Sequence, residues 1–231
     1  MNRDIVYILK DGIVSEELKY SLRTVEANFP HRLVWFVGGR RAGLKPDRAL
    51  NHRQYGPTKW DLIKSSMLEV VKQPELSDEF YLFNDDFFVM KPFTGDFINY
   101  ADRTLTDRVE DFRLESASLN RYARTLLQAR DELKALGYDE INFDVHLPML
   151  FEKSKVTESI KQCKSPQMRS VYGNINSVPF IDRRDVKVYR LDTIPEDMDF
   201  VSTNDRTFIH GDIGRYIRET YTTPSRFEVR E

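Results

Sequence analysis

Two adjacent carboxylates and an amide interrupt a strongly apolar stretch of the sequence. Asn84, Asp85 and Asp86 stand inside the apolar run of residues 80–90, which ends before Pro92. A run of this length is typical of a strand buried on both faces. Because buried carboxylates are costly without a positive partner, we expect them at the strand's exit, in a cleft, holding Mg²⁺ or Mn²⁺. The alternative is a strand-to-turn corner built from turn-forming residues.

Other side chains suit the same chemistry, and each has a structural alternative. His146 can act as a general base, because an unperturbed imidazole has a pKa of about 6.5, or it can be a hydrogen-bonded structural histidine. Arg23, on a predicted helix, and Lys59, at the start of another, can bind phosphate oxygens or be solvated helix-face charges. Asn204 and Asp205 repeat the Asn–Asp pair, and they either add a metal ligand, orient an acceptor or form a turn.

Several common catalytic motifs are missing from the sequence. It contains no GxxxxGK[ST] or GxGxxG phosphate loop, no GxSxG and no CxxC. Serine-esterase and dithiol redox chemistry therefore lack support. The single Cys163 forbids an intramolecular disulfide and indicates a reducing compartment.

Composition indicates one globular domain. The chain has 231 residues, of which 40% are hydrophobic and 31% charged, and its formal net charge is −2. We therefore do not expect nucleic acid as a partner, although short basic clusters at residues 39–41 and 183–184 leave a local basic patch open. The polar first residues and the lack of an apolar run of about 18 residues predict a soluble, cytoplasmic protein without a transmembrane segment.

Apolar periodicity in the first half predicts alternating strands and helices. The predicted strands cover residues 4–9, 33–37 and the run 80–90, the predicted helices cover residues 15–29 and 60–71, and residues 40–57 form a surface loop. This alternation predicts an α/β fold with a mostly parallel central sheet flanked by helices. Ligands sit beyond the carboxyl ends of such strands, where Asp11, Gly38 and Asp85 follow.

The pattern weakens after Pro92. We predict helices over residues 119–136 and 155–163, a turn at 171–174, a half-buried strand over 186–191 and a strand-like run at 200–202. No composition break marks a second domain. We therefore predict one domain over residues 1–231, with an α/β ligand-binding half (1–92) and an acceptor-side half with a helical and irregular cap (93–231).

Four blocks of the sequence resemble, in the same order, the conserved motifs of the Stealth family. These are the sugar-phosphate transferases of capsule synthesis and of lysosomal-enzyme tagging. The blocks are residues 4–12 with 17–26, residues 83–88, residues 145–148, and residues 200–205 with 224–228. The most specific parts are the Tyr-Ser-Leu-Arg of residues 20–23 and the Asn-Asp-Asp of residues 84–86.

The resemblance implies a GT-A-like domain with a nucleotide-sugar donor, and transfer of a sugar 1-phosphate with release of a nucleoside monophosphate. It implies that Asp85 and Asp86 bind metal and donor phosphates, that Arg23 holds donor phosphate and that His146 serves the acceptor hydroxyl. Together with the patterns above, the predicted site comprises the metal ligands Asp85, Asp86 and Asp205, the donor-binding residues Asp11, Gly12, Arg23, Lys59, Asn84 and Asn204, and the catalytic residues Arg23, Asp86 and His146.

The function that we predict is that of a metal-dependent transferase with a nucleotide-sugar donor, a UDP-sugar, and a glycan or polymer acceptor. Two alternatives stay open. One is a glycosyltransferase that moves only the sugar to a polymer such as teichoic acid, capsule or modified DNA. The other is an inactive binding module with the same fold. All site assignments require residues 85, 86, 146 and 205 to meet at one water-accessible hollow.

Overall fold

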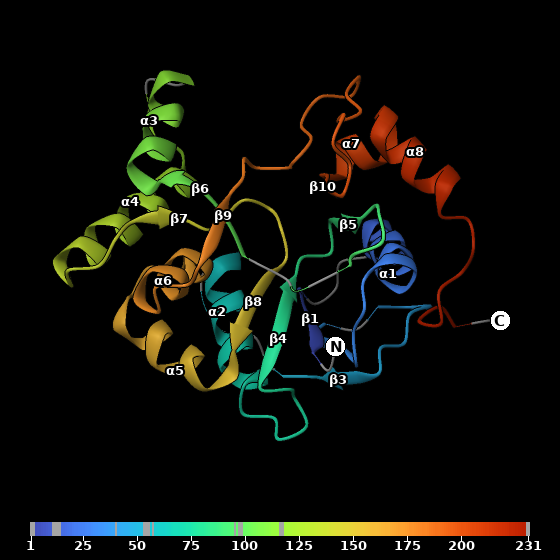
Figure 1. Cartoon of the computed structure of the whole chain (residues 1–231), viewed down its shortest axis with the longest axis horizontal. Coiled ribbons are helices and arrows are strands. Elements are labelled where there is room, and N and C mark those ends of the chain that lie inside the picture. Colours follow the sequence, from blue (N-terminus) through green and yellow to red (C-terminus); the bar gives the residue numbers. More distant parts are fainter. Residues whose placement is uncertain are drawn as a thin grey trace.

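The computed structural model is a mixed α/β protein (Figure 1). It describes residues 3–10, 15–39, 41–52, 56, 58–94, 96, 99–115 and 118–229. The strands are β1 (Asp4–Leu9), β2 (Val34–Gly38), β3 (Arg48–Leu50), β4 (Glu79–Phe83), β5 (Phe87–Val89), β6 (Asn99–Thr104), β7 (Ile141–Asn142), β8 (Met149–Glu152), β9 (Phe180–Asp182) and β10 (Phe200–Ser202). The helices are α1 (Glu16–Asn28), α2 (Lys59–Val70), α3 (Leu105–Glu115), α4 (Arg121–Ala135), α5 (Lys153–Gln162), α6 (Met168–Ile175), α7 (Asp205–His210) and α8 (Asp212–Thr220).

The central sheet confirms the predicted, mostly parallel architecture. Its strand order is β3-β2-β1-β4-β8, with β3, β2, β1 and β4 parallel and β8 antiparallel to β4. After β3 the chain crosses back to place β4 on the other side of β1. The direction of strand addition therefore reverses between β1 and β4, and in open α/β sheets ligands bind beyond the carboxyl ends of the strands at such a reversal.

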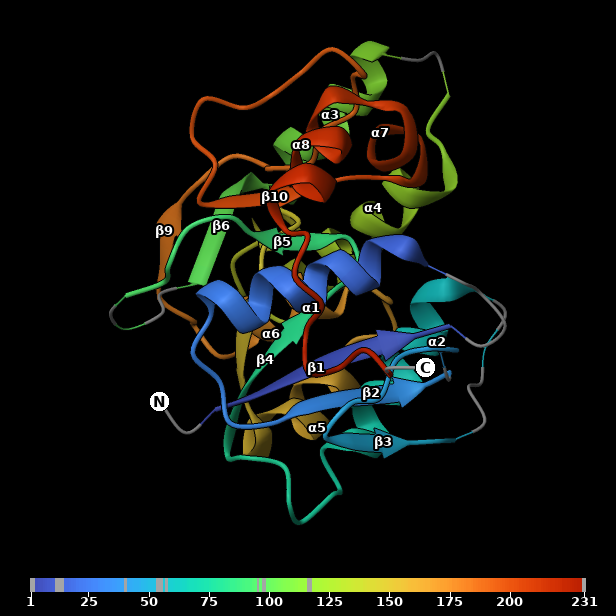
Figure 2. The ribbon, with the colours of Figure 1, turned by 90° about the vertical axis from the view of Figure 1, so that its right-hand side faces the viewer.

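Helices cover both faces of this sheet, as the apolar strands require. Alternating β1 side chains divide between the faces: Ile5 and Tyr7 pack with α1, whereas Val6 packs with α2, α5 and α6. Figure 2 shows α1 lying along one side of the sheet. Ser15 caps the start of α1 by accepting a hydrogen bond from the Leu18 amide, and the helix begins where the sequence predicted it.

Two smaller layers pack beside the central sheet and its helices. Helices α3 and α4 pack with α6 around a separate apolar cluster, and β6 pairs with β7 and β9 beside them. Strands β5 and β10 form an antiparallel pair on which α7 and α8 pack. The second half of the chain also returns β8 to the central sheet, so the two predicted halves share one sheet.

Four predicted elements are corrected by the structure. The run of residues 80–90 is two strands, β4 and β5, because the chain turns at residues 84–86. The predicted turn at residues 171–174 lies inside helix α6, and residues 186–191 form only an isolated bridge at Lys187. The predicted loop over residues 40–57 contains the edge strand β3.

The chain beyond α8 runs back across α1, as Figure 2 shows. Phe227 is buried, and its carbonyl oxygen accepts a hydrogen bond from the Lys45 amide at 2.7 Å. The Arg23 guanidinium, on α1, binds both carboxylate oxygens of Glu228, each at 2.7 Å. Because these side chains are only 7% and 12% exposed, the pair fixes the C-terminal segment to α1.

Gly214→Ala is expected to lower the free energy of unfolding by about 2 kcal/mol. A Cβ atom at this position of α8 would lie 1.9 Å from the Phe208 carbonyl oxygen of α7. Helix propensity alone would make the alanine variant more stable by about 1 kcal/mol. A lower free energy of unfolding, measured by urea denaturation, would therefore show that the added Cβ disturbs the close packing of α7 and α8. The matched control is the exposed neighbour, Arg215→Ala, with a change below about 0.5 kcal/mol. An equal or higher stability of the Gly214 variant would contradict this packing.

Candidate functional site

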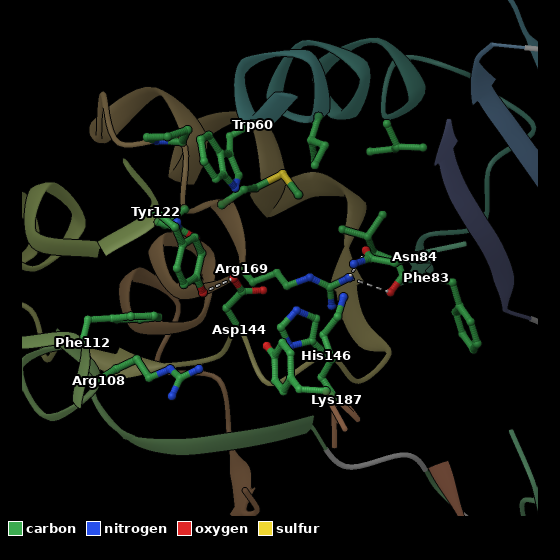
Figure 3. A pocket seen from close by; sticks show the side chains of 17 residues that line it. Trp60, Phe83, Asn84, Arg108, Phe112, Tyr122, Asp144, His146, Arg169 and Lys187 are labelled. Atoms are coloured by element: carbon green, nitrogen blue, oxygen red, sulfur yellow. Dashed lines mark hydrogen bonds between the residues drawn. The ribbon is translucent and has the colours of Figure 1, made fainter. Parts of the chain in front are cut away.

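A cavity of about 770 Å³ opens where the direction of strand addition reverses between β1 and β4. Figure 3 shows side chains from several elements converging on it. The lining residues are Ile8, Trp60, Ile63, Leu82, Phe83, Asn84, Arg108, Phe112, Tyr122, Asp144, His146, Pro166, Gln167, Met168, Arg169, Lys187 and Tyr189. A pocket of this size with a few convergent polar groups is typical of a small-molecule site.

The turn after β4 places the predicted acids beside this cavity. Asn84 lines it, and its Oδ1 accepts a hydrogen bond from Arg169 Nη2 at 3.0 Å. The Asp86 carbonyl accepts from the Thr203 amide at 3.2 Å. Asp86 Oδ2 pairs with Lys187 Nζ at 2.7 Å. Two segments more than a hundred residues apart are therefore joined at this turn.

His146 lies on the loop before β8 with a positive φ of 50°. Its Nδ1 lies 2.9 Å from Asp185 Oδ1, and the Phe87 ring packs edge-on against the imidazole at 6.5 Å between centroids. Among the described residues, no group forms a hydrogen bond with its Nε2 atom. His146 lines the cavity, so this nitrogen is available to a ligand.

Arg169 is a buried cation in the cavity wall that the sequence analysis missed. Its guanidinium donates to the carbonyl oxygens of Leu147 (2.8 Å) and Leu82 (3.3 Å) as well as to Asn84. In the described part of the chain, no carboxylate lies within ion-pairing distance of it. Burial lowers the pKa of Arg169, and the charges of Asp144 and Asp86 partly offset this effect. An anion in the cavity would relieve that cost.

Acidic side chains gather on the other side of the turn. Burial raises the pKa of Glu17, in the first turn of α1, to about 8, and the negative charges of Asp86, Asp85 and Asp205 add to the rise, against a hydrogen bond from Thr203 that lowers it. Burial, followed by the charge of Asp86, raises the pKa of Asp85. These carboxylates therefore share one electrostatic environment.

The acids fit a hard divalent cation in part. Asp86 Oδ1 is buried and accepts no hydrogen bond from any described residue. Within the described ranges, no three aspartate, glutamate, histidine or cysteine side chains come close enough to form a metal site by themselves. Mg²⁺ commonly uses one or two carboxylates and completes its shell with water and substrate phosphates. Asp86 Oδ2 already pairs with Lys187 Nζ, so Asp86 Oδ1 is the atom of this carboxylate that is left for a cation.

Aromatic rings form the opposite end of the cavity. Trp60 of α2 and Tyr122 of α4 lie with ring centroids 6.2 Å apart and nearly parallel, and Phe112 meets Tyr122 edge-on. The Tyr122 hydroxyl donates to Asp144 Oδ2 at 2.7 Å. Figure 3 places these rings on the side away from Asn84 and Lys187. The cavity therefore has a charged end at β4 and an aromatic end.

The structure brings some predicted residues together and assigns others to the framework. Asn84 and His146 line the cavity, and Asp86 contacts the lining residue Lys187 without lining the cavity itself. Asp85 and Asp205 are not among the lining residues, so the expected meeting of residues 85, 86, 146 and 205 at one hollow is not observed; the charges of Asp85 and Asp205 act on Glu17 instead. Asn204 caps α7, because its Oδ1 accepts from the Thr207 amide at 3.0 Å, so the turn interpretation holds for this side chain. Arg23 is not among the cavity-lining residues, and it pairs with Glu228. Asp11, Gly12 and the side chain of Lys59 lie outside what the structure describes.

Three further functional candidates escaped the sequence analysis: Arg169, Asp185 and Lys187. Asp185 and Lys187 stand two residues apart, so an extended chain directs both to the same side. That alternation was visible in the sequence, but nothing in it showed which residues would face them. The polar and apolar residues around Arg169 form no motif or clear periodicity that would mark it as a site residue.

The sequence matches no protein-family model and no curated protein at a significant level. The functional assignment therefore depends on the residues and geometry above. In the parts of the chain with described coordinates, every helix is too short or too polar to span a bilayer.

Arg23→Met and Glu228→Gln are each expected to lower the free energy of unfolding by about 2 kcal/mol, because each leaves a largely buried charge without its partner. The double variant should lose little more than either single variant, which a double-mutant cycle in urea measures. Lys19→Met, whose ammonium is 3.7 Å from Glu228 and more exposed, is the control with a small effect. Loss of donor binding in the Arg23 variant alone would instead support the predicted phosphate role.

Glu17→Gln is expected to flatten the dependence of stability on pH. The folded-state pKa of about 8 lies above the ordinary 4.5, so the native protein holds a proton that the unfolded chain releases. The stability of the wild type is therefore highest below the unfolded pKa and falls as the pH rises toward 8, by a few kcal/mol in total. Urea unfolding at several pH values between about 5 and 9 measures the slope. The control is exposed Glu16→Gln, and parallel curves for both variants and wild type would contradict the assignment.

Proposed function

We propose that this protein is a metal-dependent transferase that uses a nucleotide-sugar donor and moves a sugar 1-phosphate to a glycan hydroxyl. The main support for this proposal is the cavity beside β1 and β4. There the turn that begins at Asn84 meets the cations Arg169 and Lys187 and the imidazole of His146, whose Nε2 accepts no hydrogen bond from a described residue. Cations suit the donor phosphates, and the histidine suits proton removal from an acceptor.

The resemblance to the Stealth family supports the same proposal, because its separate motif blocks are neighbours in space. Strand β5 of the second block pairs with β10 of the fourth. Glu17 of the first block accepts a hydrogen bond from Thr203 of the fourth. Phe87 of the second block packs against His146 of the third. The order of strands β3-β2-β1-β4 also suits the GT-A-like fold that the resemblance implies.

In the proposed reaction, the acceptor oxygen forms a bond to the sugar-bearing phosphorus, and the phosphoanhydride bond breaks to release a nucleoside monophosphate. His146 Nε2 takes the hydroxyl proton as that bond forms. Arg169 and Lys187 stabilise the negative charge of the phosphates. A Mg²⁺ or Mn²⁺ ion held by Asp85 and Asp86 would neutralise further phosphate charge when bound.

The aromatic end of the cavity supports a ring-shaped ligand. Trp60, Phe112 and Tyr122 offer flat apolar surface beside the Asp144 carboxylate, an acceptor for hydroxyl or amide hydrogens. A sugar or nucleobase has both an apolar face and hydrogen-bond donors at its rim. The pairing of aromatic surface with phosphate-binding cations therefore fits a sugar nucleotide better than a purely ionic ligand.

Incubation with UDP-sugars, Mn²⁺ and glycan acceptors is expected to release UMP, identified by chromatography. Release of UDP would instead indicate transfer of the sugar alone and would contradict the proposed phosphotransfer.

Asp86→Asn is expected to weaken Mn²⁺ binding and turnover by about 10- to 100-fold, because it removes a charged ligand. Exposed Asp192→Asn, whose carboxylate pairs with Arg190, is the matched control. If the wild type binds the donor without turnover, and Asp85→Asn and Asp86→Asn bind it with the same affinity, the protein is an inactive binding module.

A further inference from the structure

The role of His146 as a base depends on which of its two ring nitrogens carries the hydrogen. A neutral imidazole carries one N–H, and it can accept a proton only at the other nitrogen. His146 also has a left-handed backbone conformation, in which a non-glycine residue needs support from its surroundings. The backbone conformation at His146 must therefore be stabilised by the residues around it.

Asp185 is the partner at Nδ1. Its Oδ1 lies 2.9 Å from His146 Nδ1 and also accepts the Lys187 amide at 2.9 Å, while Arg108 Nη2 lies 3.7 Å from the other oxygen. Burial alone would raise the pKa of Asp185, but the hydrogen bond and charge of His146, with the Lys187 amide, lower it below its ordinary value. An ionised carboxylate only accepts, so the hydrogen between the two side chains belongs to Nδ1.

We propose that Asp185 is the positioning residue of His146: its carboxylate holds the hydrogen on Nδ1 and directs the Nε2 lone pair into the cavity, toward the acceptor hydroxyl. This inference rests on the proposed function for its catalytic consequence, but the hydrogen position is a property of the free protein. During transfer, Nε2 takes the hydroxyl proton, and the Asp185 carboxylate stabilises the resulting imidazolium. The imidazolium then returns the proton to solvent.

The same short segment also serves the acidic turn. Lys187 stands two residues after Asp185, and its ammonium pairs with Asp86 Oδ2. The Lys187 amide, in turn, bonds the carboxylate that holds His146. The segment of residues 185–187 therefore fixes both the base and one proposed metal ligand, and it sets their separation.

The direct test is ¹⁵N NMR of the histidine rings in the free protein, at a pH where imidazoles are neutral. His146 is assigned by comparison with His146→Gln, because the chain has four histidines. Wild type is expected to show the Nδ1–H form. Asp185→Ala should lose that preference, whereas Asp185→Asn should keep much of it through its remaining carbonyl oxygen. Asp144→Asn, a change to another cavity-lining side chain, should leave His146 unaltered. An Nε2–H form in wild type, or an unchanged form in Asp185→Ala, would overturn the proposal.

Turnover gives the second readout. Asp185→Ala is expected to reduce kcat about 10- to 100-fold with little change in the KM of the donor, and Asp185→Asn should fall between this variant and wild type. Equal kcat values in all three proteins would overturn the catalytic part of the inference. If wild type shows the Nδ1–H form but no transfer with any sugar nucleotide, the proposed function fails while the hydrogen position stands.

Discussion

Repulsion among buried carboxylates at the exit of β4 is the constraint on which the site depends. Asp85 and Asp86 come one residue after the end of the strand, and Glu17, in the first turn of α1, is close enough to feel their charges. Each is largely shielded from water, and burial together with the neighbouring acids raises the pKa of Glu17 to about 8, so Glu17 holds a proton at neutral pH. Lys187 compensates Asp86, and Thr203 donates to Glu17. The segments that supply Lys187 and Thr203 come from the distant C-terminal part of the chain. The site therefore exists only when the whole chain has folded.

The sharp turn at residues 84–86 follows from the same constraint. The chain turns at residues 84–86 and then enters β5, which pairs with β10 instead of with the central sheet. This redirection places Asn84 at the cavity and Asp86 beside Lys187. It also leaves the Arg169 guanidinium facing the amide of Asn84 instead of a carboxylate. The cavity thus has Arg169 and Lys187 in its wall, with Asp86 behind Lys187.

The parallel part of the sheet could be predicted because its elements carry local signals. Strands β1 and β2 are short apolar runs, and α1 has a serine cap, an apolar stripe and a proline after its end. The division of the run of residues 80–90 had only the turn-forming Asn84, Asp85 and Asp86 as a signal, and it was the alternative interpretation, because Phe87–Val89 is as apolar as the strand before it. Helix α6 contains Gly173 and Asn174, residues typical of turns, and it is held by contacts from elsewhere. Phe143 packs where a Cβ of residue 173 would lie, and Asn174 bonds both backbone groups of Ile141.

The residues of the candidate site likewise fall into those that the sequence could indicate and those that it could not. The Asn84–Asp86 turn and His146 stand out by residue type beside apolar sequence. Their partners do not: Asp185 is 39 residues from His146, and Lys187 is 101 residues from Asp86. Arg23 had a pattern compatible with phosphate binding, but its partner Glu228 lies 205 residues away. Pairings over such separations leave no periodic trace in one sequence.

The position of β8 has a consequence for biosynthesis. This strand pairs with the edge of β4 that faces away from β1, yet it emerges from the ribosome some seventy residues later, after α3 and α4. Until then, the apolar edge of β4 is an open template for pairing with another nascent chain. Slow translation between β4 and β8 would therefore favour aggregation, and a chaperone that shields this edge would favour the native protein.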